Sequence, residues 1–188
     1  MTMTTTTKKP RNNKKIVLDN NCFMFEILDL ASKQRTNAKK VEVLKEYENL
    51  PLKSIFIWNF DETVISMLPE GEVPYGNLKE DASASGNLSD KIRVASQTNN
   101  TIAEESLKTK KTSIRNEYTK FYNFVKGGND SLSSIRREVM FINILEGLHP
   151  EEAELLVLVK DKNLSNKYKI SFENVKQAYP DIQWGNRS

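Results

Sequence analysis

The segment from Arg136 to Asp161, RREVMFINILEGLHPEEAELLVLVKD, constrains the fold of this chain more than any other. Its apolar residues predict two helices, joined at a corner that runs from Gly147 to His149-Pro150-Glu151-Glu152. Proline suits the first position of a helix, because its missing N–H would have no partner there. Acidic side chains suit the same turn, since the N-terminal end of a helix dipole is positive. The sequence therefore predicts a helical hairpin at the centre of the core.

Helical spacing of apolar residues recurs along most of the chain. Thr36 is an expected helix cap, and Asp130 or Ser131 is the expected cap of the helix that runs through Leu145. Seven glycines and six prolines are few for the many tight turns of a barrel or sandwich. The predicted fold class is therefore all-α, with helices over residues 22–33, 37–49, 51–60, 116–126, 131–145, 150–160 and 171–179.

We expect these helices to form one compact domain over residues 21–182. Its predicted core comprises Phe25, Leu28, Leu44, Ile55, Trp58, Phe121, Val139, Ile142, Leu145, Leu155 and Leu158. A basic tail, residues 1–20, is expected to be disordered, because its Thr, Lys and Asn cannot bury enough apolar surface. Residues 79–115, rich in Ser, Thr, Asn and Lys, are expected to be a long flexible insertion, and residues 183–188 a C-terminal tail.

The net charge of +3 conceals a segregated distribution. Residues 1–15 carry basic side chains and no acid, and residues 106–137 carry eight basic side chains against Glu117 and Asp130. Such segregation favours an anionic partner, although a tail that only aids solubility and a solvated linker explain it equally well. We predict DNA contacts at Lys8, Lys9, Arg11, Lys14, Lys15, Lys110, Lys111, Arg115, Lys120, Lys126, Gly127, Gly128, Arg136 and Arg137.

Two glycines follow a lysine in this stripe, at Lys126-Gly127-Gly128. Glycine lets a backbone approach a phosphate closely, and exposed amides beside a lysine can bind one. The alternative is an ordinary glycine that ends a helix, followed by a helix with solvent-facing arginines.

No residue pattern typical of an enzyme or a metal site occurs in the sequence. One histidine and one cysteine, far apart, do not make a zinc site, and no phosphate-binding P-loop is present. We expect His149 to cap a helix, and Cys22, which opens an apolar helix, to be a core thiol rather than a nucleophile. We expect no enzyme activity, cofactor or metal. No apolar run approaches the ~18 residues of a membrane span, so we also expect no membrane partner.

The segments FVKGGND and RREVMFINILEGLHPEEAELLVLVKDK, with the ending AYPDI, resemble an uncharacterised family of small proteins from tailed phages of the T-even and cyanophage type. A second resemblance concerns MFEILDLASKQRTNAKKVEVLKEYENLPLKSIFIWNFD, which is similar to the start of the N-terminal helical domain of phage ATP-dependent DNA ligases. RREVMFINIL and Tyr179–Ile182 are similar to the close of that domain. The second resemblance implies duplex-DNA binding through the backbone. The catalytic motif Lys-x-Asp-Gly is absent, which implies a DNA-binding domain without the ligase.

The sequence-based prediction of function is a non-catalytic phage accessory protein that binds duplex DNA without sequence specificity, through phosphate contacts. The expected location is the host cytoplasm during infection, or the virion. One alternative is a virion or assembly protein that docks to other phage structural subunits. The other is an adaptor whose acidic face, residues 138–154, binds a host or replication protein.

Overall fold

The computed structural model describes residues 14–75 and 112–188. These residues form eight α-helices and one 3₁₀-helix, and they contain no β-strand. The prediction of an all-α fold is therefore confirmed. The helices are α1 Met24–Ser32, α2 Asn37–Glu46, α3 Leu50–Phe60, α6 Ile114–Glu117, η2 Tyr118–Phe124, α7 Ser134–Gly147, α8 Pro150–Lys160, α9 Leu164–Lys167 and α10 Phe172–Ala178.

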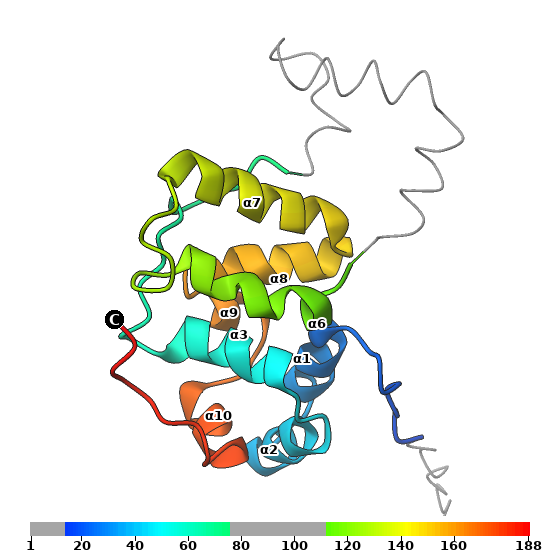
Figure 1. The fold of residues 1–188 in the computed structure, drawn as a ribbon. Helices are drawn as coiled ribbons and strands as arrows, with labels where there is room; N and C mark the ends of the chain where they lie inside the picture. Colours follow the sequence, from blue (N-terminus) through cyan, green and yellow to red (C-terminus); the bar gives the residue numbers. More distant parts are fainter. Residues whose placement is uncertain (1–13, 76–111) are drawn as a thin grey trace, which may run out of the picture.

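The helices pack in layers around α3 and α8 (Figure 1). The predicted hairpin is present: α7 forms the outer edge of the domain and packs against α8, which in turn contacts α3. At the opposite edge, α2 packs against both α1 and α10. The segment α6–η2 continues as one arm whose 3₁₀ part contacts both α3 and α7. This arm therefore contacts the outer helix of the hairpin, α7, on one side and α3 on the other.

Local signals place several helix ends where the sequence predicts them. The Thr36 hydroxyl accepts from the Lys39 amide at 3.3 Å, and His149 Nδ1 accepts from the Glu151 amide at 3.1 Å. Helix α8 then begins at Pro150, as expected. The cap of α7 is Ser133 rather than Asp130 or Ser131, because residues 130–132 form a turn before the helix begins.

The arm differs from the α-helix predicted over residues 116–126. Residues Tyr118–Phe124 form a 3₁₀-helix, which has three residues per turn. Phe121 and Phe124, three positions apart, are both buried. The tighter helix keeps these aromatic rings on the side that faces the core.

The predicted core is mostly confirmed. Most of its residues are buried, and Phe25, Ile142 and Leu158 are half-buried. The prediction that Val139 lies in the core is wrong. Its side chain is 51% exposed, because α7 turns Phe141, Ile144 and Leu145 toward the core instead.

Three boundaries of the folded domain also differ from those predicted. Residues 79–111 of the predicted insertion lie outside the described residues, but residues 112–115 belong to the folded domain, where Ile114 is buried. At the start, the Leu18 amide donates to the Tyr47 hydroxyl at 3.0 Å. At the end, the residues predicted as a tail pack on the domain, with the Trp184 ring edge-on to Phe172 at 4.7 Å.

A buried carboxylate joins three helices. Glu152 in the first turn of α8 is fully buried and accepts from the Met24 amide at 3.1 Å and the Ile114 amide at 3.0 Å. These amides begin α1 and α6 and have no partner within their own helices. Burial raises the pKa of Glu152, and the two amide bonds partly offset that effect. Glu152 thus caps two helices other than its own.

Lysine side chains fix the segment that follows α3. Lys160 Nζ is buried and donates to the carbonyl oxygens of Pro69 and Gly71, each at 2.8 Å. Lys162 Nζ donates to the carbonyl oxygens of Trp58 and Asp61, each at 2.8 Å.

Within the described residues, no helix has the length and apolar character that crossing a membrane requires.

Candidate nucleic-acid interface

The predicted DNA contacts do not form one continuous surface. Lys8, Lys9, Arg11, Lys110 and Lys111 lie outside the described residues. Lys14 and Lys15 are exposed in the N-terminal segment, and Lys15 lies 3.4 Å from Glu46. This segment lies at the opposite end of the domain from the loop 125–133 that precedes α7 (Figure 1).

Arg137 is not available to a phosphate, so its assignment as a DNA contact is wrong. The residue is 3% exposed. Its Nε donates to the carbonyl of Asn123 at 2.8 Å, and Nη2 donates to the carbonyls of Asn129 and Leu132 at 3.1 and 3.0 Å. Arg137 therefore holds the loop 125–133 in place.

Two further predicted contacts are engaged inside the protein. Arg115 Nε donates to the Cys22 carbonyl at 2.9 Å. Lys120 pairs with Glu117 at 2.8 Å, although the lysine side chain remains 54% exposed. Burial by itself raises the pKa of Glu117, but hydrogen bonds from Lys120 and Thr112 outweigh it and lower the pKa below the ordinary value. Glu117 is therefore ionised at neutral pH.

The backbone of Lys126-Gly127-Gly128 does not offer a phosphate cradle. The Lys126 amide donates to the Ile65 carbonyl at 2.8 Å and the Gly128 amide to the Val125 carbonyl at 3.2 Å. The Gly127 amide donates to the carboxylate of Asp130 at 3.1 Å. All three amides are therefore used, and the prediction that they bind a phosphate is wrong.

The two glycines have separate structural reasons. Gly127 has φ +85°, which disfavours residues with a side chain. A Cβ on Gly128 would lie 1.9 Å from the carbonyl oxygen of Tyr122, so this backbone approach requires glycine.

The loop instead forms one wall of a groove between α3 and η2, here called the aromatic groove. Its volume is about 450 Å³, and no Asp or Glu lines it. Lys126 and Arg187 supply its cations. Its other lining residues are Ser54, Ile57, Trp58, Val64, Tyr118, Thr119, Phe121, Tyr122, Val125, Gly127 and Gly128.

The aromatic side chains form a floor and a rim. Trp58 and Phe121 are buried, with ring centres 5.3 Å apart in an edge-on arrangement. Tyr122 is 54% exposed, and Tyr118 is half-buried. The groove thus presents an accessible tyrosine ring above a hydrophobic floor.

Arg187 is the lining residue farthest along the chain and was absent from the predicted site. Its Nη1 pairs with the buried carboxylate of Asp61 at 2.6 Å, and Asp61 also accepts from the Gly185 amide at 3.0 Å. Burial by itself raises the pKa of Asp61, but hydrogen bonds from Thr63, Gly185 and Arg187 lower it to about 2. The C-terminal residues therefore complete the groove through a carboxylate that follows α3.

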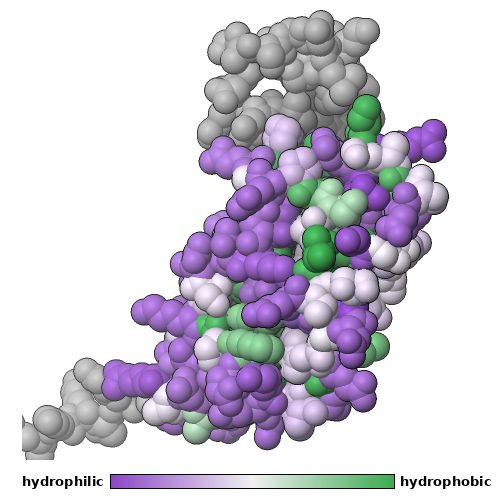
Figure 2. Space-filling model, turned by 90° about the vertical axis from the view of Figure 1, so that its left-hand side faces the viewer, coloured by the Kyte–Doolittle hydropathy of each residue, from purple (hydrophilic) through white to green (hydrophobic). Residues whose placement is uncertain are grey.

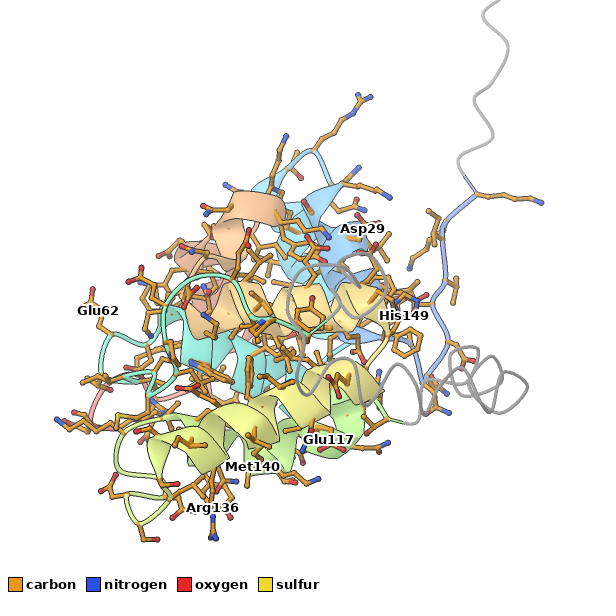
Figure 3. The ribbon with its side chains drawn as sticks, turned by 90° about the horizontal axis from the view of Figure 1, so that it is seen from above. Asp29, Glu62, Glu117, Arg136, Met140 and His149 are labelled. Atoms are coloured by element: carbon orange, nitrogen blue, oxygen red, sulfur yellow. The ribbon has the colours of Figure 1, made fainter. Side chains whose placement is uncertain are left out.

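A second groove, here called the α7 groove, lies on the other side of η2. Its volume is about 590 Å³. Ile135 and Val139 of α7 are 76% and 51% exposed at its edge. In Figure 3, Arg136 and Met140 lie along α7, and Glu117 lies on the neighbouring arm. The other lining residues are Thr112, Lys120, Leu132, Asn143 and Ile144.

Arg136 and Lys126 are the predicted contacts that remain accessible near these grooves. Both are exposed, and neither pairs with a carboxylate of the described residues. Figure 2 shows this end of the domain, where the surface is mostly hydrophilic and a few hydrophobic side chains interrupt it.

Other candidate sites have structural roles. His149 caps α8, and its ring stacks on Phe25 with ring centres 5.0 Å apart. Burial raises the pKa of the Cys22 thiol. Residues 14–75 and 112–188 contain no cluster of three or more His, Cys, Asp or Glu that could hold a metal ion.

Several carboxylates of the acidic face predicted over residues 138–154 are buried or paired with a lysine. Glu152 is buried, and Glu151 and Glu154 both pair with Lys167, at 3.1 and 2.9 Å. These carboxylates do not form one free acidic surface.

A family described as a family of unknown function, DUF6433, matches two overlapping stretches of the chain, residues 27–100 and 92–166. The chain belongs to this family. No curated protein matches it, and no solved structure matches it.

Proposed function

We propose that this member of the DUF6433 family is a non-catalytic accessory protein that binds duplex DNA through its phosphates. The observation that carries the proposal is the pair of accessible cations, Lys126 and Arg136, at the end of the domain where the carboxylate-free groove opens. Phosphate contacts of this kind position a protein without reading sequence. Binding is therefore expected to be largely independent of base sequence.

The N-terminal end of α7 supports an anionic partner. This helix has 14 residues, and its first turn carries no acid. The helix dipole is positive at this end and disfavours a cation there. Arg136 nevertheless occupies the first turn, exposed. Its charge is unfavourable with respect to the helix dipole, whereas it adds to the attraction of the helix end for a phosphate.

The resemblance of the sequence to small proteins of tailed phages supports an accessory role in an infected cell, in the host cytoplasm or in the virion. The resemblance to the helical domain of phage DNA ligases supports duplex DNA as the partner. The absence of the Lys-x-Asp-Gly motif supports binding without nucleotide transfer.

Salt dependence of binding to a duplex of mixed sequence tests the proposal. Each phosphate contact contributes roughly −0.9 to the slope of log K against log salt, so K126A/R136A should reduce the slope by about 1.8. The matched control is K39A/K45A, which removes the same charge from exposed lysines of α2 at the far edge of the domain. No duplex binding at about 50 mM salt, where phosphate contacts are strong, contradicts the proposal. Equal effects of the two double variants contradict the assignment of the site.

A second candidate function is docking of a helix from a partner protein, as an assembly protein or an adaptor would require. The exposed Ile135 and Val139 beside the α7 groove favour it, because amphipathic helices bind in hydrophobic grooves. I135S/V139S should abolish such an interaction and leave DNA binding unchanged. Retention of the partner by this variant contradicts docking at this surface.

A further inference from the structure

We propose that the aromatic groove binds an unpaired base of a single-stranded nucleic acid, which stacks on Tyr122. The inference rests on the proposed function, because Lys126 serves as a phosphate contact in both. It adds a second class of ligand, single strands, at a site distinct from the first turn of α7.

A base can stack only on an aromatic ring that is exposed in the groove. Trp58 and Phe121 are 2% and 7% exposed, so they form the floor and offer little surface to a ligand. Tyr122 is 54% exposed at the rim and is the accessible ring of the groove. Bases stack on exposed aromatic side chains, and this contact tolerates any base because each has a π-face.

The charge of the lining selects a strand with phosphates. No carboxylate lines the groove, and Lys126 lines it together with Tyr122. A single strand presents a base and its adjoining phosphate to neighbouring sites, which is the combination of stacking ring and cation seen in single-strand binding proteins. The partner of Arg187 is the carboxylate of Asp61, so Lys126 is the cation left for the phosphate.

The volume and the backbone suit one nucleotide. A volume of about 450 Å³ falls within the range of roughly 300–1,000 Å³ found for small-ligand sites. Gly127 and Gly128 add no side chain to the wall beside Tyr122, and a Cβ on Gly127 would meet open space. In a duplex the bases are paired and stacked on one another, so only a strand with unpaired bases can occupy the groove.

Binding of fluorescent oligothymidylate and oligouridylate of about 16 nucleotides tests the inference beside a blunt duplex of equal length. Y122A should weaken binding of the single strand by about 5- to 140-fold, from the usual contribution of one stacked base. Y122F keeps the ring and should bind within about twofold of the wild type. Both variants should bind the duplex like the wild type. Because Tyr122 is exposed, its replacement should leave the melting temperature unchanged.

A second readout locates the strand. The chain has two tryptophans, Trp58 in the groove floor and Trp184 near the C-terminus. In a W184F background, single-strand binding should change the fluorescence of Trp58, and Y122A should abolish that change.

The outcomes separate the inference from the proposed function. If Y122A binds single strands like the wild type while K126A/R136A loses duplex binding, the inference fails and the proposed function stands. If single strands bind in a Tyr122-dependent manner and the duplex does not bind, the inference stands and duplex recognition fails. If neither binds, both fail.

Discussion

Two buried charges at opposite ends of the α7–α8 hairpin organise the backbone with opposite chemistry. Glu152, at the start of α8, accepts from the amides that begin α1 and α6. Arg137, near the start of α7, donates to the carbonyls of the loop 125–133 and of η2. Each charge satisfies backbone groups that would otherwise be buried without partners.

The difference lies in what surrounds the two charges. Near Glu152, the neighbouring acidic residues Glu151 and Glu154 are paired with Lys167, so the carboxylates at this end form ion pairs within the protein. The loop that Arg137 holds carries the exposed Lys126 and borders the aromatic groove. One buried charge therefore joins helices, and the other shapes a surface available to a ligand. Substitutions at Glu152, Arg137 and Asp61 test this division, in order from the largest expected effect to the smallest.

Glu152→Ala should lower the free energy of unfolding by about 3–5 kcal/mol, because two buried amides lose their acceptor. Glu152→Gln keeps the shape and one acceptor oxygen but turns an NH₂ group toward the other amide, so its loss should be intermediate. Urea unfolding measures both. A Glu152→Gln variant as stable as the wild type contradicts the assigned capping role.

Arg137→Met should lower the free energy of unfolding by about 3 kcal/mol, because three carbonyls lose a charged donor. Arg136→Met is the matched control: the same substitution at the exposed neighbour should change stability by less than about 0.5 kcal/mol. Urea unfolding of both variants makes the comparison. Similar losses at the two positions would show that Arg137 does not act through the loop carbonyls.

We expect Asp61, which lies beside the aromatic groove, to make the stability of the fold depend on pH. Its pKa is lowered from 3.8 to about 2 in the folded protein, so its carboxylate stabilises the fold by roughly 2 kcal/mol above pH ~4. That contribution should be lost as the pH falls from about 4 through about 2. Asp61→Asn should be less stable at neutral pH and should lack this part of the acid transition. Melting temperatures measured across that range check it, and identical profiles for both proteins contradict it.

Signals within a few residues predicted much of the fold. The His149-Pro150 corner and the two glutamates set the start of α8, and Thr36 caps α2. Tyr118, Phe121 and Tyr122 fit an α-helix in the sequence, but Tyr118 and Phe121 are three positions apart, a spacing that also suits a helix of three residues per turn. Whether this segment forms a 3₁₀-helix or an α-helix depends on its packing against α3 and α7. The pattern of neighbouring residues in the sequence does not reveal that packing.

The candidate site was less predictable, because its parts come from distant segments. Arg136 and Arg137 are identical neighbours in sequence, and only the carbonyls of Asn123, Asn129 and Leu132 decide which one is buried. The helix dipole explains acidic residues at the start of α8 but does not show that Glu152 reaches Met24, 128 positions away. The aromatic groove likewise joins α3, η2 and the last residues of the chain.

The three-residue turn of η2 arranges its side chains in straight columns. Glu117 and Lys120 face the α7 groove, whereas the columns of Tyr118 with Phe121 and of Thr119 with Tyr122 face the aromatic groove. An α-helix of 3.6 residues per turn would rotate these positions past one another along its length. Substitutions in one column of η2 can therefore alter the chemistry of one groove while the other keeps its lining, so the two surfaces can diversify independently.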